Sequence, residues 1–437
     1  MSARKMKDSG IEWIGEIPEE WEISKVSYFY KITLGKMLQP NAKEESDTLE
    51  NYLCALNVFW NKITTDNIKQ MWFAKSEKKQ YELTAGDLIV TEGGDVAAAC
   101  IWEGEVNPCY IQNAVYRVRS LPGFLNKYLY YHLFVAKTTG YIDMLCNKAT
   151  IAHFTKDKFS NLPFIVLPLD EQQKIVAHLD EKCGEIDKVV VSKQKQNEQL
   201  AEYRQSLITE AVTKGLKPLA PMQDSGIEWI GEIPEKWEIS KIKHLLSTPI
   251  TDGPHETPEI LEEGIPFISA EAVKNLKVNF ELKRGFISQI DHERFCKKCK
   301  PQFGDIFMVK SGATTGNIAR VDTHEEFSIW SPLALIRVKN TVIKRDYMFY
   351  FLQSNLFRLQ VELFWSYGTQ QNIGMEVLEN LYAPYPSLGM QQKIAAYLDK
   401  KCGEIDALSG RNKNIIESLQ EYKQSLIYEA VTGKIEL

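Results

Sequence analysis

The sequence predicts an α+β fold in which two mixed globules alternate with two long helices, as an internal repeat with pseudo-twofold symmetry. A helix-forming segment at 169–217 recurs at 388–436, an offset of 219 residues. A second segment at 8–25 recurs at 224–241, an offset of 216 residues. Self-similarity at a nearly constant offset indicates copies of one structural unit. Half of a 437-residue chain is also long enough to bury its own core.

Each long helix is predicted from apolar residues at seven-residue steps, with one polar residue in each series. The series are Leu179, Ile186, Lys193, Leu200 and Leu207, and then Leu398, Ile405, Asn412, Leu419 and Leu426. Such a seam requires a partner helix, and because both copies carry it we expect them to pair as an antiparallel coiled coil. The alternative is two ordinary surface helices, each packed on its own globule. Gly184 and Gly403 are weak positions at which each rod could divide.

The globules are predicted from short β-rich runs and from apolar helical stretches. Strands are expected at 87–91, 116–119, 305–309 and 333–338, where Gly, Pro or charged residues bound the runs. Buried helices are expected at 126–136 and 345–357. The predicted divisions are a first globule at 1–168, a first helix at 169–217, a second globule at 218–387 and a second helix at 388–437.

Composition excludes several classes of protein. No apolar run approaches the ~18 residues that a membrane-spanning helix needs, so no membrane association is expected. Eight cysteines spread over the chain form no disulfide framework, which favours reduced thiols in the cytoplasm. Cys296 and Cys299 form a lone CxxC pair with only His292 nearby, and a structural zinc site needs four ligands. We therefore expect no metal site.

The net charge of −6 argues against indiscriminate nucleic-acid binding by the whole surface. Lys274–Lys300 nevertheless contains eight basic and three acidic residues, a local excess of five positive charges. A solvated face explains most charge runs, but this segment could instead contact DNA phosphates. Antiparallel rods would place two globules at opposite ends, and such a pseudo-twofold protein suits a duplex with two spaced half-sites.

A search for catalytic motifs predicts a chain without an activity of its own. Asn107-Pro108-Cys109-Tyr110 lies one residue from the Asn-Pro-Pro-Tyr tetrapeptide of adenine methyltransferases, but it has no counterpart in the second half and no Gly-rich cofactor loop accompanies it. We therefore interpret it as an Asn-Pro turn. The chain contains no phosphate-binding Gly-x-x-x-x-Gly-Lys-Ser/Thr loop, no His-Glu-x-x-His helix and no Gly-x-Ser-x-Gly turn.

The repeated motifs together resemble the specificity (S) subunit of Type I restriction–modification systems, over essentially the whole chain. The lead-in Asp-Ser-Gly-Ile-Glu-Trp-Ile-Gly-Glu-Ile-Pro begins at Asp8 and at Asp224, and Gln-Gln-Lys-Ile begins at Gln172 and at Gln391. Asp-Gly-Pro-His at 252–255 and Gly-Thr-Gln-Gln-Asn-Ile at 368–373 are similar to that family's target recognition domains.

The resemblance implies a division of labour among several chains. Each target recognition domain would read one half of a bipartite site in double-stranded DNA, and the paired helices would set the spacing. Two methyltransferase (M) subunits would bind S-adenosylmethionine and methylate adenine, and restriction (R) subunits would use ATP and Mg. This chain would bind no cofactor and catalyse nothing.

Base edges in the major groove are read by Arg, Lys, Asn, Gln, Ser and Thr on loops between strands. The candidates in the first globule are Asn57, Lys62, Thr91, Lys148, Thr150 and His153. Those in the second are Lys310, Ser311, Thr314, Arg320, Gln370, Gln371 and Asn372.

Two other functions remain as alternatives to a DNA specificity subunit of a restriction complex. One is a coiled-coil scaffold whose globules bind proteins, and the other is a specificity subunit that directs methylation without a restriction partner.

Overall fold

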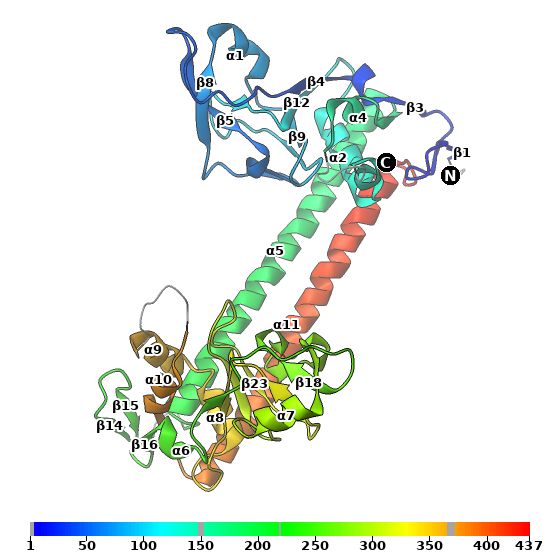
Figure 1. Ribbon diagram of the computed structural model, residues 1–437. Helices are drawn as coiled ribbons and strands as arrows, with labels where there is room; N and C mark the ends of the chain where they lie inside the picture. Colours follow the sequence, from blue (N-terminus) through cyan, green and yellow to red (C-terminus); the bar gives the residue numbers. More distant parts are fainter. Residues whose placement is uncertain (1–3, 147–152, 218–219, 365–371) are drawn as a thin grey trace. The chain divides into compact units, whose positions relative to one another are not determined.

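The computed structural model describes residues 4–146, 153–217, 220–364 and 372–437 (Figure 1). The chain forms two compact units, one made of Met1–Lys193 with Lys413–Leu437 and the other of Gln194–Asn412. We call them unit 1 and unit 2. Each of the two long helices contributes residues to both units, so the units cut across the four segments predicted from the sequence.

Unit 1 contains a four-stranded antiparallel sheet in the order β10-β9-β12-β4 and a three-stranded sheet in the order β11-β5-β8. Strand pairs β1–β2, β3–β13 and β6–β7 complete it. Its strands are β1 Met6–Asp8, β2 Glu16–Pro18, β3 Glu22–Lys25, β4 Tyr30–Leu34, β5 Thr48–Leu53, β6 Val58–Phe59, β7 Lys62–Ile63, β8 Lys69–Phe73, β9 Leu88–Thr91, β10 Ala99–Ile101, β11 Tyr110–Ile111, β12 Val115–Ser120 and β13 Pro163–Val166. Its shorter helices are η1 Val26–Tyr28, η2 Ala55–Asn57, α1 Lys75–Tyr81, α2 Asn126–Thr138, α3 Tyr141–Cys146 and α4 Lys156–Ser160.

Unit 2 repeats this plan with a larger main sheet in the order β17-β25-β22-β23-β20-β19 and a second sheet in the order β21-β18-β24. Pairs β14–β15 and β16–β26 lie outside these sheets. Its strands are β14 Met222–Asp224, β15 Glu232–Pro234, β16 Glu238–Lys241, β17 Thr251–Asp252, β18 Ile265–Ile268, β19 Val273–Lys274, β20 Lys277–Val278, β21 Gly285–Ile287, β22 Ile306–Val309, β23 Ile318–Arg320, β24 Ser328–Ile329, β25 Leu333–Ile336 and β26 Tyr382–Tyr385. Its shorter helices are α6 Ile242–Leu245, η3 Ala270–Ala272, η4 Phe280–Leu282, α7 Gln289–Cys296, α8 Arg345–Phe351, α9 Asn355–Phe364 and α10 Met375–Asn380.

The two long helices are α5, Leu169–Thr213, and α11, Leu388–Val431, and neither is interrupted at its central glycine. The structure therefore confirms the predicted rods and removes the possibility that each divides in two. The predicted strands are also present, as β9, β12, β22 and β25. The helix expected at 345–357 is instead two helices, α8 and α9. Ser354 separates them because its hydroxyl accepts a hydrogen bond from the Phe357 amide (3.2 Å) and caps the second helix.

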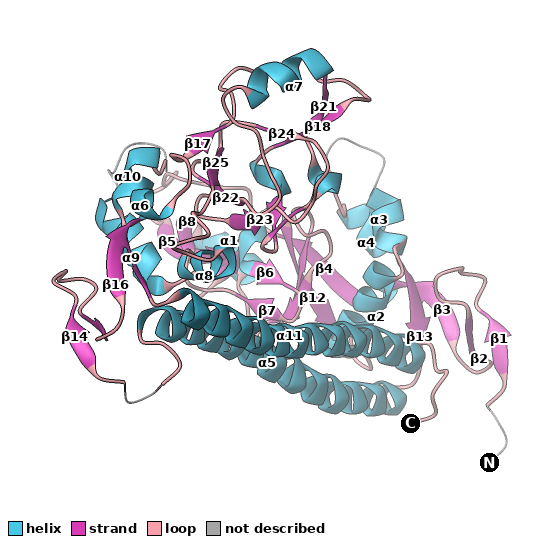
Figure 2. Ribbon diagram, turned by 90° about the horizontal axis from the view of Figure 1, so that it is seen from below, coloured by secondary structure: helices cyan, strands magenta, loops and turns pink. Residues whose placement is uncertain are grey.

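In each unit, α5 and α11 lie side by side and run in opposite directions (Figures 1 and 2). In unit 1 the Lys423 ammonium lies 2.7 Å from the Asp187 carboxylate. In unit 2, Arg204 lies 3.4 Å from Asp406. Residue numbers 187 and 423 sum to 610, as do 204 and 406, so both units share one antiparallel register. The two contacts are also copies of each other at the 219-residue offset.

The predicted seam positions face the interior in both units. Leu179, Ile186 and Leu426 are buried in the core of unit 1, where Leu419 packs against them. Leu207, Leu398 and Ile405 are buried in the core of unit 2, with Leu200 beside them. The polar seam residue Asn412 is buried and donates a hydrogen bond to Asn197 (3.0 Å), which satisfies its amide within the helix pair. Lys193 is half-buried.

One buried glutamine in each copy joins the start of the long helix to its globule. The side chain of Gln172 accepts a hydrogen bond from the Leu125 amide (3.1 Å) and donates to the Leu167 carbonyl (3.0 Å). Gln391, 219 residues later, makes the same bonds with Lys344 (2.7 Å) and Pro386 (2.7 Å). Both glutamines have 0% exposure. The first Gln of each Gln-Gln-Lys-Ile motif is therefore a structural connector.

The end of each long helix packs against the lead-in of the same unit. In unit 1, the Tyr428 hydroxyl donates to the Ile14 carbonyl (3.0 Å), and Ala430 and Val431 belong to the same core as Trp13 and Trp21. In unit 2, Ala211 and Val212 at the end of α5 share a core with Ile233 and Trp237. The repeated lead-in is thus the surface that receives a helix end.

Candidate nucleic-acid interface

Two loops meet beside the central strand of each globule. In unit 1 the Phe154 amide donates to the Glu92 carbonyl (2.8 Å), which brings the segment before α4 against the end of β9. In unit 2 the Ile373 amide donates to the Lys310 carbonyl (2.7 Å), and Ser311 forms a β-bridge with Asn372. These pairs are equivalent in the two copies. The repeat therefore places two irregular loops together at the same place in each globule, a typical location for binding residues on a rigid sheet.

The described candidates of unit 1 fall into two groups. Lys62, in the hairpin strand β7, and His153, in the meeting loops, are exposed. Asn57 and Thr91 are buried instead. The Asn57 amide donates to the Thr64 carbonyl (3.1 Å) and its oxygen accepts from the Cys54 amide (3.0 Å), whereas the Thr91 hydroxyl donates to the Asp95 carbonyl.

The structure thus assigns both buried side chains to holding turns, so we leave Asn57 and Thr91 out of the contact set proposed below. Sequence reasoning missed this, because a buried and an exposed Asn or Thr look alike in a single sequence. Lys148 and Thr150 lie outside the described residues.

In unit 2 the structure brings Lys310, Ser311 and Asn372 together and leaves Arg320 apart. Thr314 and Asn372 are exposed, and Ser311 is half-buried. Arg320 contacts the Asp346 carboxylate (3.4 Å), and its guanidinium lies 4.9 Å from the Phe349 ring centroid. Arg320 therefore serves the packing of β23 on α8, and we also leave it out of the contact set. Gln370 and Gln371 lie outside the described residues.

Lys310 is buried because it is part of an ionic cluster that the sequence did not predict. Its ammonium lies 2.8 Å from the carboxylate of Asp252, whose side chain is 1% exposed. The Lys298 ammonium lies 2.6 Å from the other oxygen of Asp252, and His255 Nε2 lies 3.2 Å from the carboxylate. Burial raises the pKa of Asp252, but the two lysines outweigh it and hold that pKa below its usual range. Asp252 is thus ionised at neutral pH.

The remaining polar features concern metal-ligating and thiol groups. No group of three or more His, Cys, Asp or Glu there is arranged to hold a metal ion. Cys296 lies 3.5 Å from His292, whereas Cys299 accepts from the Thr251 hydroxyl (3.5 Å). Cys109, of the methyltransferase-like tetrapeptide, is buried, and this burial raises the pKa of its thiol to about 12. Nor is any helix in the described ranges long and apolar enough to cross a membrane.

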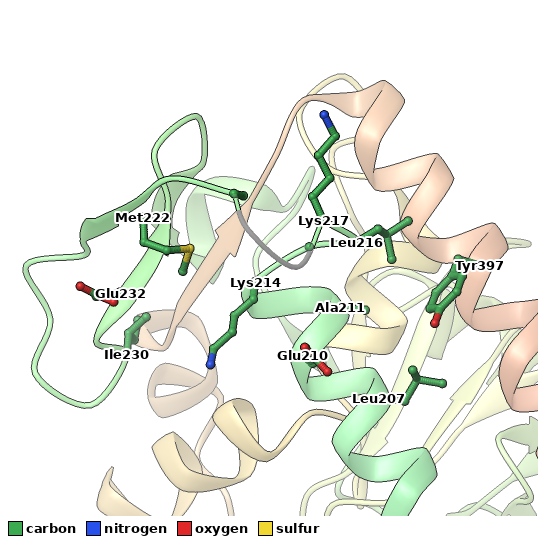
Figure 3. A pocket seen from close by; sticks show the side chains of 12 residues that line it. Leu207, Glu210, Ala211, Lys214, Leu216, Lys217, Met222, Ile230, Glu232 and Tyr397 are labelled. Atoms are coloured by element: carbon green, nitrogen blue, oxygen red, sulfur yellow. The ribbon is translucent and has the colours of Figure 1, made fainter.

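A cavity of about 620 Å³ lies in unit 2 where α5 ends (Figure 3). Its lining side chains include Leu207 of α5, Lys214 and Lys217 of the segment that follows α5, Met222 and Glu232 of the β14–β15 pair, and Tyr397 of α11. It combines apolar and charged side chains and contains neither His nor Cys. The cavity thus lies where the start of the second half packs against the ends of the two long helices.

Comparison with known proteins identifies relatives along nearly the whole chain. A family model for the Type I restriction modification DNA specificity domain matches residues 18–199 and 234–418. The Type I restriction enzyme MjaVIII specificity subunit of Methanocaldococcus jannaschii is 24% identical over 425 residues, which cover 96% of this chain and 94% of that protein. The putative MjaX specificity subunit of the same organism is 24% identical over 442 residues, covering 97% and 95%.

A solved structure shares the fold. It concerns complex assembly and conformational transition of the type I R-M system. Its matching chain superimposes with a TM-score of 0.71 at 16% identity, covering 96% of this chain and 99% of that chain. The two matches of the family model, one in each half, coincide with the repeat described above.

Proposed function

This chain belongs to the Type I restriction modification DNA specificity family, and from this premise we propose that each of its two globules reads one half of a bipartite DNA site. The chain is the DNA sequence-specificity subunit of such a system. The internal repeat is the observation that supports recognition of two half-sites by two globules. Both halves keep the same contacts at the globule–helix junction, while the loops beside the central strands differ in sequence.

We assign base reading to the loops that meet beside β9 and β22. In unit 2 the exposed Thr314 and Asn372 carry the hydroxyl and amide groups that recognise base edges. The sequence adds Gln370 and Gln371, which directly precede Asn372. In unit 1 His153 and Lys62 are the exposed candidates, together with Lys148 and Thr150 from the sequence. The division at 1–168 and 218–387 gives the two target recognition domains.

The paired helices α5 and α11 set the distance between the half-sites in this proposal. They share one antiparallel register in both units, with Asp187–Lys423 in one and Asp406–Arg204 in the other. Leucine and isoleucine side chains fill the seam, which makes the pair a stiff spacer. The helical segments 169–217 and 388–437 are therefore the spacer elements.

Two methyltransferase subunits are the proposed protein partners, because both units expose the same two apolar positions of the long helices. In unit 1 these are Val189 and Tyr422, which lie close in sequence to Asp187 and Lys423 and have 43% and 57% exposure. Their equivalents in unit 2 are Leu408 and Tyr203, with 47% and 54% exposure. Exposed aromatic residues typically anchor protein interfaces. The same exposed apolar positions in both units therefore fit two copies of one partner.

The rest of the division of labour follows from the family. In the proposed complex this chain catalyses nothing itself. The partner methyltransferase subunits bind S-adenosylmethionine and methylate adenine, and restriction subunits bind ATP and Mg. Eight free cysteines, six of them buried, suit a reducing cytoplasm.

The test is a change confined to one globule, measured in the complex with methyltransferase subunits. Thr314→Ala with Asn372→Ala should weaken or relax recognition of one half-site by about 1–3 kcal/mol per lost bidentate contact. Methylome sequencing of cells that carry each variant reports both half-sites at once. Equal loss at both half-sites would contradict reading by separate globules, and Ser425→Ala, an exposed change on α11, is the control.

A further inference from the structure

The Asp-Gly-Pro-His motif of unit 2 builds an ionic cluster with more positive than negative charge. Asp252 is the buried anion, and Lys298 and Lys310 both lie within 2.8 Å of its carboxylate. One negative and two positive charges leave a surplus of one. Both ammonium groups stabilise the Asp252 carboxylate, but together they carry one more charge than it neutralises. An external anion would offset this surplus.

The surplus charge faces solvent. The Lys310 side chain is 11% exposed, so it is the internal partner of Asp252. Lys298 is 49% exposed and His255 is 70% exposed, and both reach Asp252 from the surface. Lys298 also donates to the Gly253 carbonyl (3.1 Å), which fixes its direction. The nearest acidic side chain of the motif segment, Glu256, is paired with Arg294 (3.1 Å).

Gly253 of the Asp-Gly-Pro-His motif allows the backbone beside Asp252 to pass close to β24. A Cβ at Gly253 would lie 2.1 Å from the Ile329 carbonyl oxygen, so only glycine allows the chain to pass this close to β24. Gly35 makes the same approach in unit 1, where a Cβ would lie 2.3 Å from the Gln112 carbonyl oxygen. The residue before it is Leu34, in place of Asp252. The backbone is therefore shared by the two copies, but the ionic cluster is not.

Unit 1 has a balanced pair at this place. Lys36 follows Gly35, is 7% exposed, and forms an ion pair with Glu77. Its ammonium also donates to the Trp72 carbonyl (3.1 Å) and lies 5.0 Å from the Phe73 ring centroid. Asp47 is a second acidic group that interacts with Lys36 and Glu77, so no positive charge is left over here. The surplus in unit 2 is therefore a property of that globule and not of the fold.

The position of the cluster identifies the anion. Lys310 begins the loop that meets Asn372. The Ser331 amide donates to the Pro254 carbonyl (3.2 Å), and this bond holds the Asp-Gly-Pro-His motif against the segment between β24 and β25. The cluster thus adjoins the loops to which we assign base reading. Phosphate groups flank every base that a protein reads, and they are contacted by lysines beside the reading loops. Resting on the proposed function, we infer that Lys298, with His255 and the Asp252–Lys310 pair behind it, binds one phosphodiester of the DNA backbone at the half-site read by unit 2.

The test measures salt dependence of duplex binding by the complex with methyltransferase subunits, on the duplex that methylome sequencing identifies. Neutralising one phosphate contact lowers the slope of log K against log salt by about 0.9. Lys298→Gln should therefore reduce the slope by about that amount, and Lys298→Arg should restore it. Lys297→Gln, a neighbouring exposed lysine, is the matched control and should leave the slope unchanged.

A second measurement locates the phosphate. A series of duplexes, each with one uncharged methylphosphonate, should contain a position at the unit 2 half-site where the wild-type complex loses about tenfold in affinity. Lys298→Gln should lose nothing further there. Three outcomes would overturn the inference while leaving DNA recognition intact. The salt slope could be unchanged in Lys298→Gln, or it could fall equally in Lys297→Gln. The affinity losses from Lys298→Gln and from the methylphosphonate could also be additive at every position. Absence of salt-dependent binding by the wild-type complex would instead refute the proposed function.

Discussion

The buried glutamine at the start of α11 offers a sharp test of how the globule is joined to the rod. Gln391→Ala removes three hydrogen bonds: one from the Lys344 amide (2.7 Å), and two donated to the carbonyls of Val342 (3.1 Å) and Pro386 (2.7 Å). Each buried polar group left without a partner costs about 1–3 kcal/mol. Water entering the site recovers part of that cost, so we expect a local loss of about 3 kcal/mol.

Hydrogen exchange measures this loss directly, because the Lys344 amide is itself one of the lost donors. With about 1.4 kcal/mol per factor of ten, its exchange should accelerate about 100-fold. Gln392→Ala is the matched control, since the next residue of the same motif is exposed and should leave the exchange of Lys344 unchanged. Equal exchange of Lys344 in both variants would refute the connector role of Gln391.

Three further predictions concern stability. Burial lowers the pKa of His132 to about 3. Between pH ~6.5 and ~3 the unfolded chain therefore binds a proton that the native state does not. The free energy of unfolding should fall by up to about 1.4 kcal/mol for each pH unit of acidification in this range. His132→Phe, which copies Phe351 at the equivalent position, should flatten that dependence, measured as denaturation midpoints at pH 7 and pH 5, and an unchanged slope would contradict the assignment. Leu398→Ala should lower the free energy of unfolding by about 2–5 kcal/mol, because Leu398 is fully buried in the seam. Leu408→Ala is the control, because Leu408 is largely exposed, and should lower it by under about 0.5 kcal/mol. Similar losses in the two variants would argue against the seam. Gly184→Ala should stabilise α5 by up to about 1 kcal/mol, because a Cβ there meets nothing within 4 Å, and a lower melting temperature would count against a continuous helix.

Periodicity made the rods predictable. Because both copies carry a seam, at Leu179 and Ile186 and again at Leu398 and Ile405, each helix has the other as its simplest partner. The central strands were predictable for another reason, since β9 and β22 are apolar runs that follow Gly-Asp. The break between α8 and α9 was not, because Gln353, Ser354 and Asn355 also fit the polar face of one helix. The cap from Ser354 to Phe357 appears only once the chain is folded.

The candidate interface was less predictable, because burial decides the role of a polar residue. Asn57 and Thr91 are suitable readers by type, yet both hold turns. Asp252 was recognised only as part of a family motif, and its role required three segments distant in sequence to meet: 251–255, 298 and 310. The Gln-Gln-Lys-Ile motif was recognised as a repeat, but the separate tasks of Gln391 and Gln392 depend on which face of the helix packs.

The spacing of the half-sites tests the account most directly. The change is an insertion of seven residues into each helix, next to Lys193 in α5 and next to Asn412 in α11. A seven-residue insertion keeps the seam in phase and lengthens each helix by about 10 Å. Duplex DNA rises about 3.4 Å per base pair, so the spacer in the methylated sites should grow by about three base pairs. Methylome sequencing should show this longer spacer between the same two half-sites. Efficient methylation at the original spacing, or a change in the half-sites themselves, would contradict the account.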